Sequence, residues 1–243
     1  MMKKGIFYAV GVGVESMDLT LRAKQVLEQA DVIVKPVKQI GASSVAYTIA
    51  EKSVNLKQTE TIELVFPMQI QTDYYNRLQN GCLQPICDCL EAGKNVAMVT
   101  LGDVSIYSTA TYVRQVLAEK GYETAVVAGI SSFSAGAAKA ECSLCENQES
   151  LIVLPVVTSK AEVEAVLEQF DTLVLMKAGK ALPWLIPLLT EKKLLSHTTM
   201  FCNIGMEGEY IGIPSIQYAS YFTTLIIKKR QTNGMQERRL VLE

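Results

Sequence analysis

Residues 96–108 read VAMVTLGDVSIYS, and this stretch decides how the chain is expected to fold. The nearly uninterrupted apolar run from Val96 to Leu101 is typical of a strand that is buried on both faces. Gly102-Asp103 follows as a turn, and residues 105–120 have a helical pattern that ends at Gly121. A buried strand, a glycine turn and a helix in succession form the repeating unit of a parallel sheet covered by helices.

The same unit recurs through the first half of the chain. We expect strands at 5–11, 31–35, 63–66, 96–101 and 124–127, and helices at 19–30, 44–54, 70–93, 105–120 and 133–139. Ser43 or Ser44 is a candidate cap of the second helix. Pro36 is expected to stop the second strand, and Pro85 to break or kink the long helical stretch around it. This alternation predicts a mostly parallel sheet with helices on both faces.

The second half of the chain has more closely spaced strands. We expect them at 151–156, 172–176, 200–203 and 222–227, with helices at 160–169 and 181–192. Their spacing predicts a mixed sheet. The expected fold is therefore α/β with two domains, 1–120 and 121–243, that pack closely and leave a ligand cleft between them.

Composition narrows the class of protein. The 23 basic and 25 acidic residues give a formal net charge of -2, which disfavours binding to nucleic acid because phosphate contacts need a basic face. No apolar stretch approaches the roughly 20 residues of a membrane span. The N-terminal apolar run ends in a glycine turn, so we read it as a buried strand and not as a signal peptide. A cytoplasmic protein that does not bind membranes is expected.

The chain has six cysteines and one histidine, His197. Cysteines of a cytoplasmic protein are expected to be reduced. Cys142 and Cys145 have the spacing of a metal or redox pair, but no second pair has the spacing that a structural zinc site needs. We therefore expect no metal held by the protein, and a surface or loop position for His197.

Residues 11–16, GVGVES, follow the first expected strand and resemble the start of a dinucleotide-binding fingerprint. Ser16 stands where the third glycine is needed, and Asp31 precedes the second strand, where an acidic residue should follow it. The segment is either a plain turn from strand to helix or a loop that lets a ligand approach the backbone closely.

Four polar residues at turns leave alternatives open. Asp103 either accepts hydrogen bonds from a ligand or caps the following helix, and Ser131 and Ser132 have the same two alternatives. Lys177 follows an apolar strand and is either a solvated charge or the partner of a carboxylate.

Taken in order, several segments resemble the tetrapyrrole methylase family. They are the loop at 8–13 with its continuation to Ala23, the strand at 30–34, the segment Gly102 to Ser108, the turn Ala128 to Ser132 and the strand end Met176-Lys177. Two further segments, at 63–68 and 105–133, resemble the branch that methylates precorrin-2, or its cobalt form, at C-20. Three prolines of the family pattern are absent, two of them replaced by Val104 and Ala128, and this is expected to loosen the loops.

The resemblance implies S-adenosylmethionine as methyl donor, a small-molecule tetrapyrrole substrate, a homodimer and a role in cobalamin biosynthesis. The donor-binding residues that it implies are Gly102, Asp103, Val104, Ile106 and Tyr107 on one side, and Ser131, Ser132 and Met176 on the other. Basic candidates for the carboxylates of the ring are Lys35, Lys38, Arg77 and Arg114. No catalytic base is identified. The alternatives are another methyltransferase of the family, or a protein that binds the ring or the donor without turnover.

Overall fold

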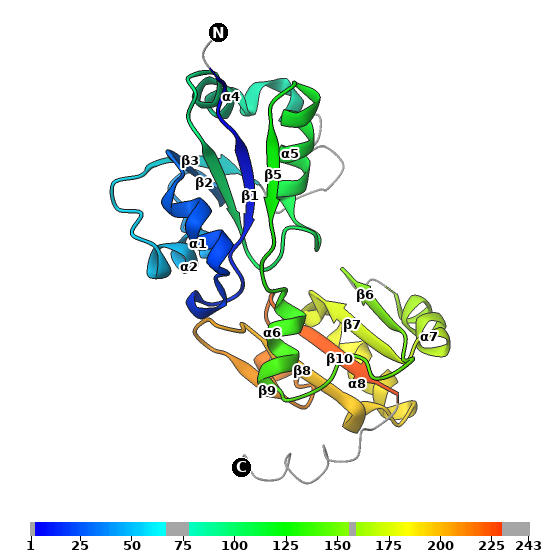
Figure 1. Ribbon diagram of the computed structural model, residues 1–243. Helices are drawn as coiled ribbons and strands as arrows, with labels where there is room; N and C mark the ends of the chain where they lie inside the picture. Colours follow the sequence, from blue (N-terminus) through cyan, green and yellow to red (C-terminus); the bar gives the residue numbers. More distant parts are fainter. Residues whose placement is uncertain (1–2, 67–77, 156–158, 230–243) are drawn as a thin grey trace. The chain divides into compact units, whose positions relative to one another are not determined.

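The computed structural model describes residues 3–66, 78–155 and 159–229, and its contacts divide the chain into two compact units, 1–131 and 132–243. The first unit contains a five-stranded sheet in the order β3-β2-β4-β1-β5, and all of its strand pairs are parallel (Figure 1). The strands are β1 (Phe7–Gly11), β2 (Val32–Val37), β3 (Glu60–Val65), β4 (Val96–Thr100) and β5 (Thr124–Val127). The predicted parallel sheet is confirmed.

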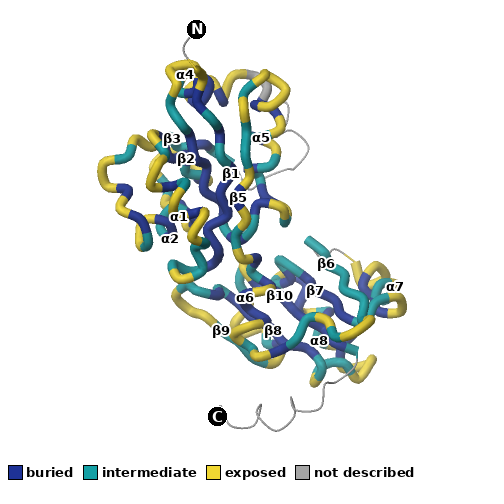
Figure 2. The backbone as a smooth tube through the Cα atoms, viewed as in Figure 1, coloured by how far each residue is buried: buried dark blue, intermediate teal, exposed yellow. Residues whose placement is uncertain are grey.

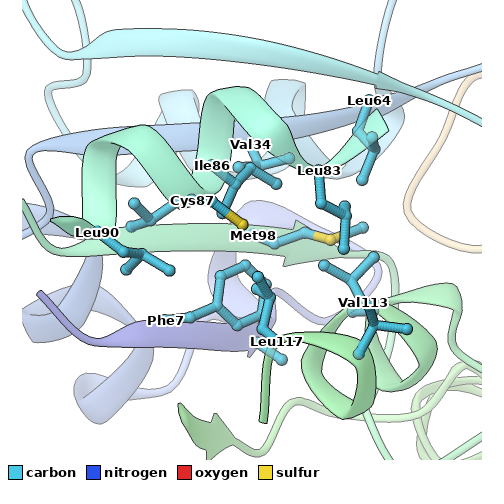
Figure 3. Close-up of a cluster of buried hydrophobic side chains, with 14 of the residues drawn as sticks. Phe7, Val34, Leu64, Leu83, Ile86, Cys87, Leu90, Met98, Val113 and Leu117 are labelled. Carbon is cyan, nitrogen blue, oxygen red and sulfur yellow. The ribbon is translucent and has the colours of Figure 1, made fainter. Parts of the chain in front are cut away.

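Helices cover both faces of this sheet, because successive side chains of each strand point to opposite faces. Val10, Ile33 and Val99 pack against α1 (Leu21–Glu28) and α2 (Val45–Ser53). The alternate strand residues pack against α4 (Gln84–Glu91) and α5 (Thr109–Glu119); Figure 3 shows this second cluster, with Phe7 and Met98 at its centre. Burial on both faces explains the continuous apolar runs, and in β1 every residue except the half-buried Tyr8 is buried (Figure 2).

Several details differ from the expectations for this unit, among them β3, which begins at Glu60 and not at Glu63. β2 continues through Pro36 to Val37. The carbonyl of Val37 accepts a hydrogen bond from Phe66 of the β3 side, so Pro36 faces the opposite edge, where pairing with β4 has already ended at Val34. Its missing N–H therefore costs no hydrogen bond of the sheet.

Pro85 lies in the first turn of α4, where a proline is tolerated; the helical stretch is broken at Leu83 just before it, so of the two expected effects the break is observed and the kink is not. The predicted helical stretch at 70–93 falls partly outside the described residues; within them, Leu78–Cys82 forms a short π-helix before α4. The helix expected at 105–120 begins at Thr109, because Tyr107 has a left-handed backbone with φ 49° that a helix cannot contain.

The second unit contains a mixed sheet in the order β6-β7-β10-β8-β9, in which only β6 and β7 are parallel. Its strands are β6 (Leu151–Leu154), β7 (Thr172–Met176), β8 (Thr198–Cys202), β9 (Tyr210–Gly212) and β10 (Thr224–Lys228). The predicted mixed sheet is confirmed. Strand β9 was not expected from the sequence, since its three residues are only half-buried and carry no apolar alternation.

Three helices complete this unit: α6 (Ser132–Lys139), α7 (Lys160–Gln169) and α8 (Leu182–Glu191). α7 and α8 pack on the face lined by Leu173, Leu175 and Met200. α6 lies on the other face, where Gly136 contacts the ring of Phe201 so closely that a Cβ there would lie 2.5 Å from it. Short helical turns occur at Ala178–Ala181, Leu195–His197 and Ile216–Tyr218 in this unit, and at Ser16–Asp18 in the first unit.

The boundary between the units follows from the sheets. Residues 124–127 form β5, which pairs with β1, so this strand belongs to the first unit. The first unit accordingly extends to Ser131, beyond the division near Gly121 that was expected from the sequence. Among the described residues, no helix is both long and apolar enough to cross a membrane.

Candidate functional site

The order of the strands defines a distinct position at the carboxyl ends of β1 and β4. These strands are neighbours, yet the chain leaves β1 toward β2 through α1 on one face, and leaves β4 toward β5 through α5 on the other. The connections therefore diverge between two adjacent strands. Such a topological switch point is where open α/β sheets bind ligands.

Three loops meet at this position through their glycines. The N–H of Gly102 donates to the carbonyl of Gly13 over 2.8 Å, and the N–H of Gly13 donates to the carbonyl of Gly102 over 3.2 Å. The third loop joins them at Gly129, where a Cβ would lie 2.2 Å from the carbonyl oxygen of Gly102 and 2.7 Å from the carbonyl carbon of Gly11. The glycines let the loops after β1, β4 and β5 pack backbone against backbone.

Asp103 connects two of these loops. Its Oδ1 accepts hydrogen bonds from the backbone N–H of Ser105, at 2.8 Å, and from the Ser105 hydroxyl, while Oδ2 accepts from the N–H of Gly129 at 2.7 Å. The alternative that Asp103 caps the following helix is wrong, because Ser108 caps α5 by accepting a hydrogen bond from Ala110. Asp103 instead ties the loop after β4 to the loop after β5.

The surroundings of Asp103 keep it negatively charged. Burial by itself would raise the pKa of its carboxyl, but hydrogen bonds from Ser105, Gly129 and Val104 outweigh burial and lower the pKa below its ordinary value. The carboxylate thus accepts four hydrogen bonds, from the hydroxyl and the N–H of Ser105 and from the N–H groups of Gly129 and Val104, which is about the number that a carboxylate can accept.

The remainder of the loop after β4 is held at both ends. Val104 is buried, and its carbonyl accepts a hydrogen bond from the Thr111 hydroxyl over 3.0 Å. The hydroxyls of Thr100 and Ser108 are hydrogen-bonded at 2.9 Å in the interior. Between these anchors, Ile106 is half-buried and Tyr107 is 53% exposed with a left-handed backbone. A non-glycine residue in this conformation is strained, and such strain is common at ligand-binding sites.

The structure thus brings together the predicted residues Gly102 and Asp103 with residues that were not predicted to bind the donor, although all but Thr111 lie in segments that stand out in the sequence. Those residues are Gly11, Gly13, Thr100, Ser108, Thr111 and Gly129. Ser131 is buried in the loop after β5, and Ser132 is half-buried as the first residue of α6. The two glycines at 11 and 13 indicate in the sequence a loop that a ligand can approach. The contact of Gly129 with this loop, more than 100 residues away, has no local sequence pattern that predicts it.

Met176 lies in the second unit as the last residue of β7, and Lys177 follows it in a left-handed conformation, with φ 53° and ψ 33°. Ala178 then donates a hydrogen bond to the carbonyl of Thr223 over 3.0 Å, which fixes the chain beside the start of β10.

The basic candidates differ in their surroundings. Lys35 is paired with Glu63 at 3.5 Å, and its Nζ lies 5.1 Å from the centre of the Tyr47 ring. Lys38 is exposed and Arg114 is half-buried. Arg77 lies outside the described residues.

Other reactive side chains do not form a centre in the described part of the chain. The described residues contain no group of three or more His, Cys, Asp or Glu side chains that could hold a metal ion. Cys142 is buried and Cys145 is exposed, neither in a disulfide, and partial burial raises the pKa of Cys145. His197 is half-buried, with Nδ1 3.3 Å from the carbonyl oxygen of Lys228.

A parallel α/β unit with glycine loops at its switch point, followed by a mixed-sheet unit, is a fold that is also seen in solved structures. The chain superimposes on a cobalt precorrin-4 methyltransferase with a TM-score of 0.68 at 16% identity, covering 92% of this chain and 94% of that one. It also superimposes on a uroporphyrin-III C-methyltransferase from Thermus thermophilus complexed with S-adenosyl homocysteine, with a TM-score of 0.64 at 16% identity, covering 93% and 98%.

The structural comparisons show the fold, and comparison of the sequence with known families shows the family. Residues 7–218 match the model of the Tetrapyrrole (Corrin/Porphyrin) Methylases, and the chain belongs to this family. A probable cobalt-precorrin-2 C(20)-methyltransferase of Methanocaldococcus jannaschii is 38% identical over 70% of this chain and 71% of its own. A cobalt-precorrin-2 C(20)-methyltransferase of Salmonella typhimurium is 29% identical over 93% and 97%. A precorrin-2 C(20)-methyltransferase of a Sinorhizobium species is 27% identical over 74% and 76%.

Proposed function

We propose that this protein transfers a methyl group from S-adenosylmethionine to C-20 of precorrin-2, or of its cobalt form, in the biosynthesis of cobalamin. The observation that carries the proposal is the similarity, over most of the chain, to relatives whose names specify this substrate and this carbon. The resemblance found in the sequence predicts the same branch of the family, the one that methylates precorrin-2 or its cobalt form at C-20.

The loops of the first unit suit the donor. S-adenosylmethionine carries a positive sulfonium, and the ionised carboxylate of Asp103 places a negative charge at the switch point, where it favours a cationic ligand. Two large apolar side chains, Tyr107 and Ile130, are exposed on the loops after β4 and β5 and offer apolar surface to a nucleoside. Ser132 and Met176 remain predicted donor-binding residues through the family resemblance.

The chemistry asks little of the protein beyond binding. The donor supplies a methyl group that is already activated for displacement. An electron pair of the ring carbon forms the new C–C bond as the C–S bond breaks in line with it, and the ring carbon then loses a proton to solvent or to a base that is not identified. The main task of the chain is to hold the two reactants in line, which can contribute a large part of the rate enhancement.

The hydrogen bonds of the loops offset the loss of the family prolines. The missing family prolines were expected to loosen the loops, yet Thr111 holds the carbonyl of Val104 at the position of one of them. Next to Ala128, at the position of another, Gly129 is held by Asp103. These hydrogen bonds preorganise the loops without the proline rings.

The test is a methylation assay with the purified full chain, methyl-labelled donor and either metal-free or cobalt-loaded precorrin-2, read by mass spectrometry. Gain of one labelled methyl group by either ring supports the proposal, and a preference between them identifies the substrate. Transfer only to a different ring intermediate would reassign the branch. Binding of S-adenosylhomocysteine by calorimetry, without transfer to any ring, would indicate a binding protein.

We also propose that the protein is a homodimer, as the resemblance implies. Light scattering coupled to gel filtration of the full chain measures this directly. A mass of a single chain at the working concentration of the assay would contradict it.

A further inference from the structure

Lys177 follows the last residue of β7 in a conformation that residues with a side chain rarely adopt. Its φ of 53° and ψ of 33° lie in the left-handed region, where a Cβ crowds the backbone. Such strain persists only where the surrounding structure enforces it, and it is concentrated at ligand-binding sites. The position therefore calls for an explanation beyond the end of a strand.

The backbone around Lys177 is fixed by the turn that precedes β10. The N–H of Ala178 donates to the carbonyl of Thr223, and a Cβ on Gly179 would lie 2.2 Å from the carbonyl oxygen of Ser220. The N–H of Ser220 in turn donates to the Thr223 hydroxyl over 2.8 Å. This tight contact holds the main chain after Lys177 and so determines the direction of its side chain.

A second strained residue lies at the same end of the sheet. Thr224, the first residue of β10, pairs with Met176 of β7 on one side and with Phe201 of β8 on the other. The ends of β7 and β8 therefore both flank the start of β10. Asn203, just beyond β8, also has a left-handed backbone, with φ 50°. Its amide is engaged, accepting from the Ser220 hydroxyl at 2.9 Å and donating to the carbonyl of Gly208 at 3.3 Å.

The ammonium group of Lys177, by contrast, has no acidic partner within the described residues. Its one recorded contact is with an aromatic ring: Nζ lies 5.7 Å from the centre of Tyr221. Other described lysines, such as Lys35 and Lys139, are paired with glutamates at 3.5 and 2.8 Å. A half-buried cation that is positioned on a ring face and lacks a carboxylate is suited to bind an anion from outside the chain.

We propose that Lys177 binds a carboxylate of one of the two reactants. This inference rests on the proposed function, which supplies two sources of that group: the amino-acid end of the methyl donor and the carboxylate side chains of the tetrapyrrole. Both present the same chemistry to the ammonium group, a charge-assisted N–H···O hydrogen bond. The sequence left Lys177 open between a solvated charge and a carboxylate partner, and the geometry favours the second.

The test compares Lys177→Met with Lys180→Met in the full chain. Lys180 is exposed in the short helix Ala178–Ala181 that directly follows Lys177, so its substitution controls for the loss of a charge in this region. Calorimetry measures the Kd of S-adenosylhomocysteine and of 5′-methylthioadenosine, which lacks the amino-acid end. Steady-state kinetics measures KM for the tetrapyrrole.

Loss of a charge-assisted hydrogen bond should weaken binding by about 10- to 100-fold. A weaker Kd for S-adenosylhomocysteine but not for methylthioadenosine identifies the donor carboxylate. A raised KM for the ring, with both nucleoside affinities unchanged, identifies the ring carboxylate. Lys180→Met should change each value by less than about twofold.

The inference is overturned if a folded Lys177→Met protein, with the circular dichroism spectrum of the wild type, binds both reactants as well as the wild type does. That result would leave the proposed function intact. Absence of methyl transfer by the wild-type protein would instead contradict the proposed function, whatever Lys177 does. A wild-type protein that binds neither reactant would contradict both.

Discussion

The backbone N–H of Gly129 donates a 2.7 Å hydrogen bond to Oδ2 of Asp103, which lies 26 residues earlier in the chain. The two residues belong to the loops that follow β5 and β4, and β1 lies between these strands in the sheet. One carboxylate therefore joins loops that no main-chain pairing connects directly. The arrangement of the candidate site depends on its charge and on the absence of a side chain at Gly129.

Asp103→Asn should destabilise the protein in a way that depends on pH. Because the folded state lowers the pKa of Asp103, its contribution to stability is complete above the ordinary pKa of about 3.9 and is lost as the pH falls through the lower, folded-state value. Urea unfolding of both proteins from pH 7 to pH 3 measures this. The difference in unfolding free energy should be largest at neutral pH and should shrink below about pH 4. A difference that stays constant over the whole range would show that the charge is irrelevant.

Gly129→Ala should be more damaging than Gly121→Ala. A Cβ on Gly129 overlaps the backbone of two other loops, neither of which can move freely, so we expect a loss of about 3 kcal/mol or more. Gly121 has φ 82° with open space around it, so its substitution costs only the left-handed strain, about 1–2 kcal/mol. Denaturant unfolding gives both values, and equal losses would contradict the close contact of the loops.

Ser108→Ala should cost more than the loss of an ordinary helix cap. It removes the cap of α5 and also leaves the buried hydroxyl of Thr100 without this partner, for a total of about 2–3 kcal/mol. Ser159→Ala is the matched control, because Ser159 caps α7 from an exposed position, and its loss should cost about 1 kcal/mol. Thermal unfolding measures both losses of stability. Equal losses for the two variants would argue against the buried hydrogen bond between Thr100 and Ser108.

Lys177→Gly should separate stability from binding. Glycine adopts the left-handed conformation without strain, so the folded protein should be as stable as the wild type or more stable by up to about 1 kcal/mol. If the ammonium group binds a reactant, this variant should lose affinity at the same time. A lower melting temperature than that of the wild type would contradict the strain.

The sequence allowed much of the fold to be predicted where strands and helices have sharp ends. Strand β5, strand β7 and helix α7 were predicted with the bounds that the structure has, because polar or turn residues flank each of them. The start of α5 was wrong, since no local pattern shows that Tyr107 adopts a left-handed backbone. The prediction that Pro36 stops its strand was wrong for a different reason. Its missing N–H faces the edge where pairing of β2 with β4 has already ended at Val34, and this depends on the neighbouring strand and not on the local sequence.

The candidate site could be predicted only in part. Gly102 and Asp103 stand out because a glycine and an acid follow a buried strand. The role of Asp103 was not resolved, because its partner Gly129 is brought near by the order of strands in the sheet. The surroundings of Lys177 come from residues 220–223, and no local signal links the two segments.

The main-chain contact of Gly11, Gly102 and Gly129 has a consequence for engineering this protein. Side chains cannot be introduced freely at these three positions. A Cβ would lie 2.7 Å from the backbone of a neighbouring loop at Gly11 and 2.2 Å from one at Gly129, and Gly102 has a left-handed backbone with φ 73°. Variation has to enter through side chains beside them, such as Ile106, Tyr107 and Ile130, which are at least partly open to solvent. A library that randomises these neighbours and leaves the three glycines untouched would explore new ligands on an unchanged scaffold.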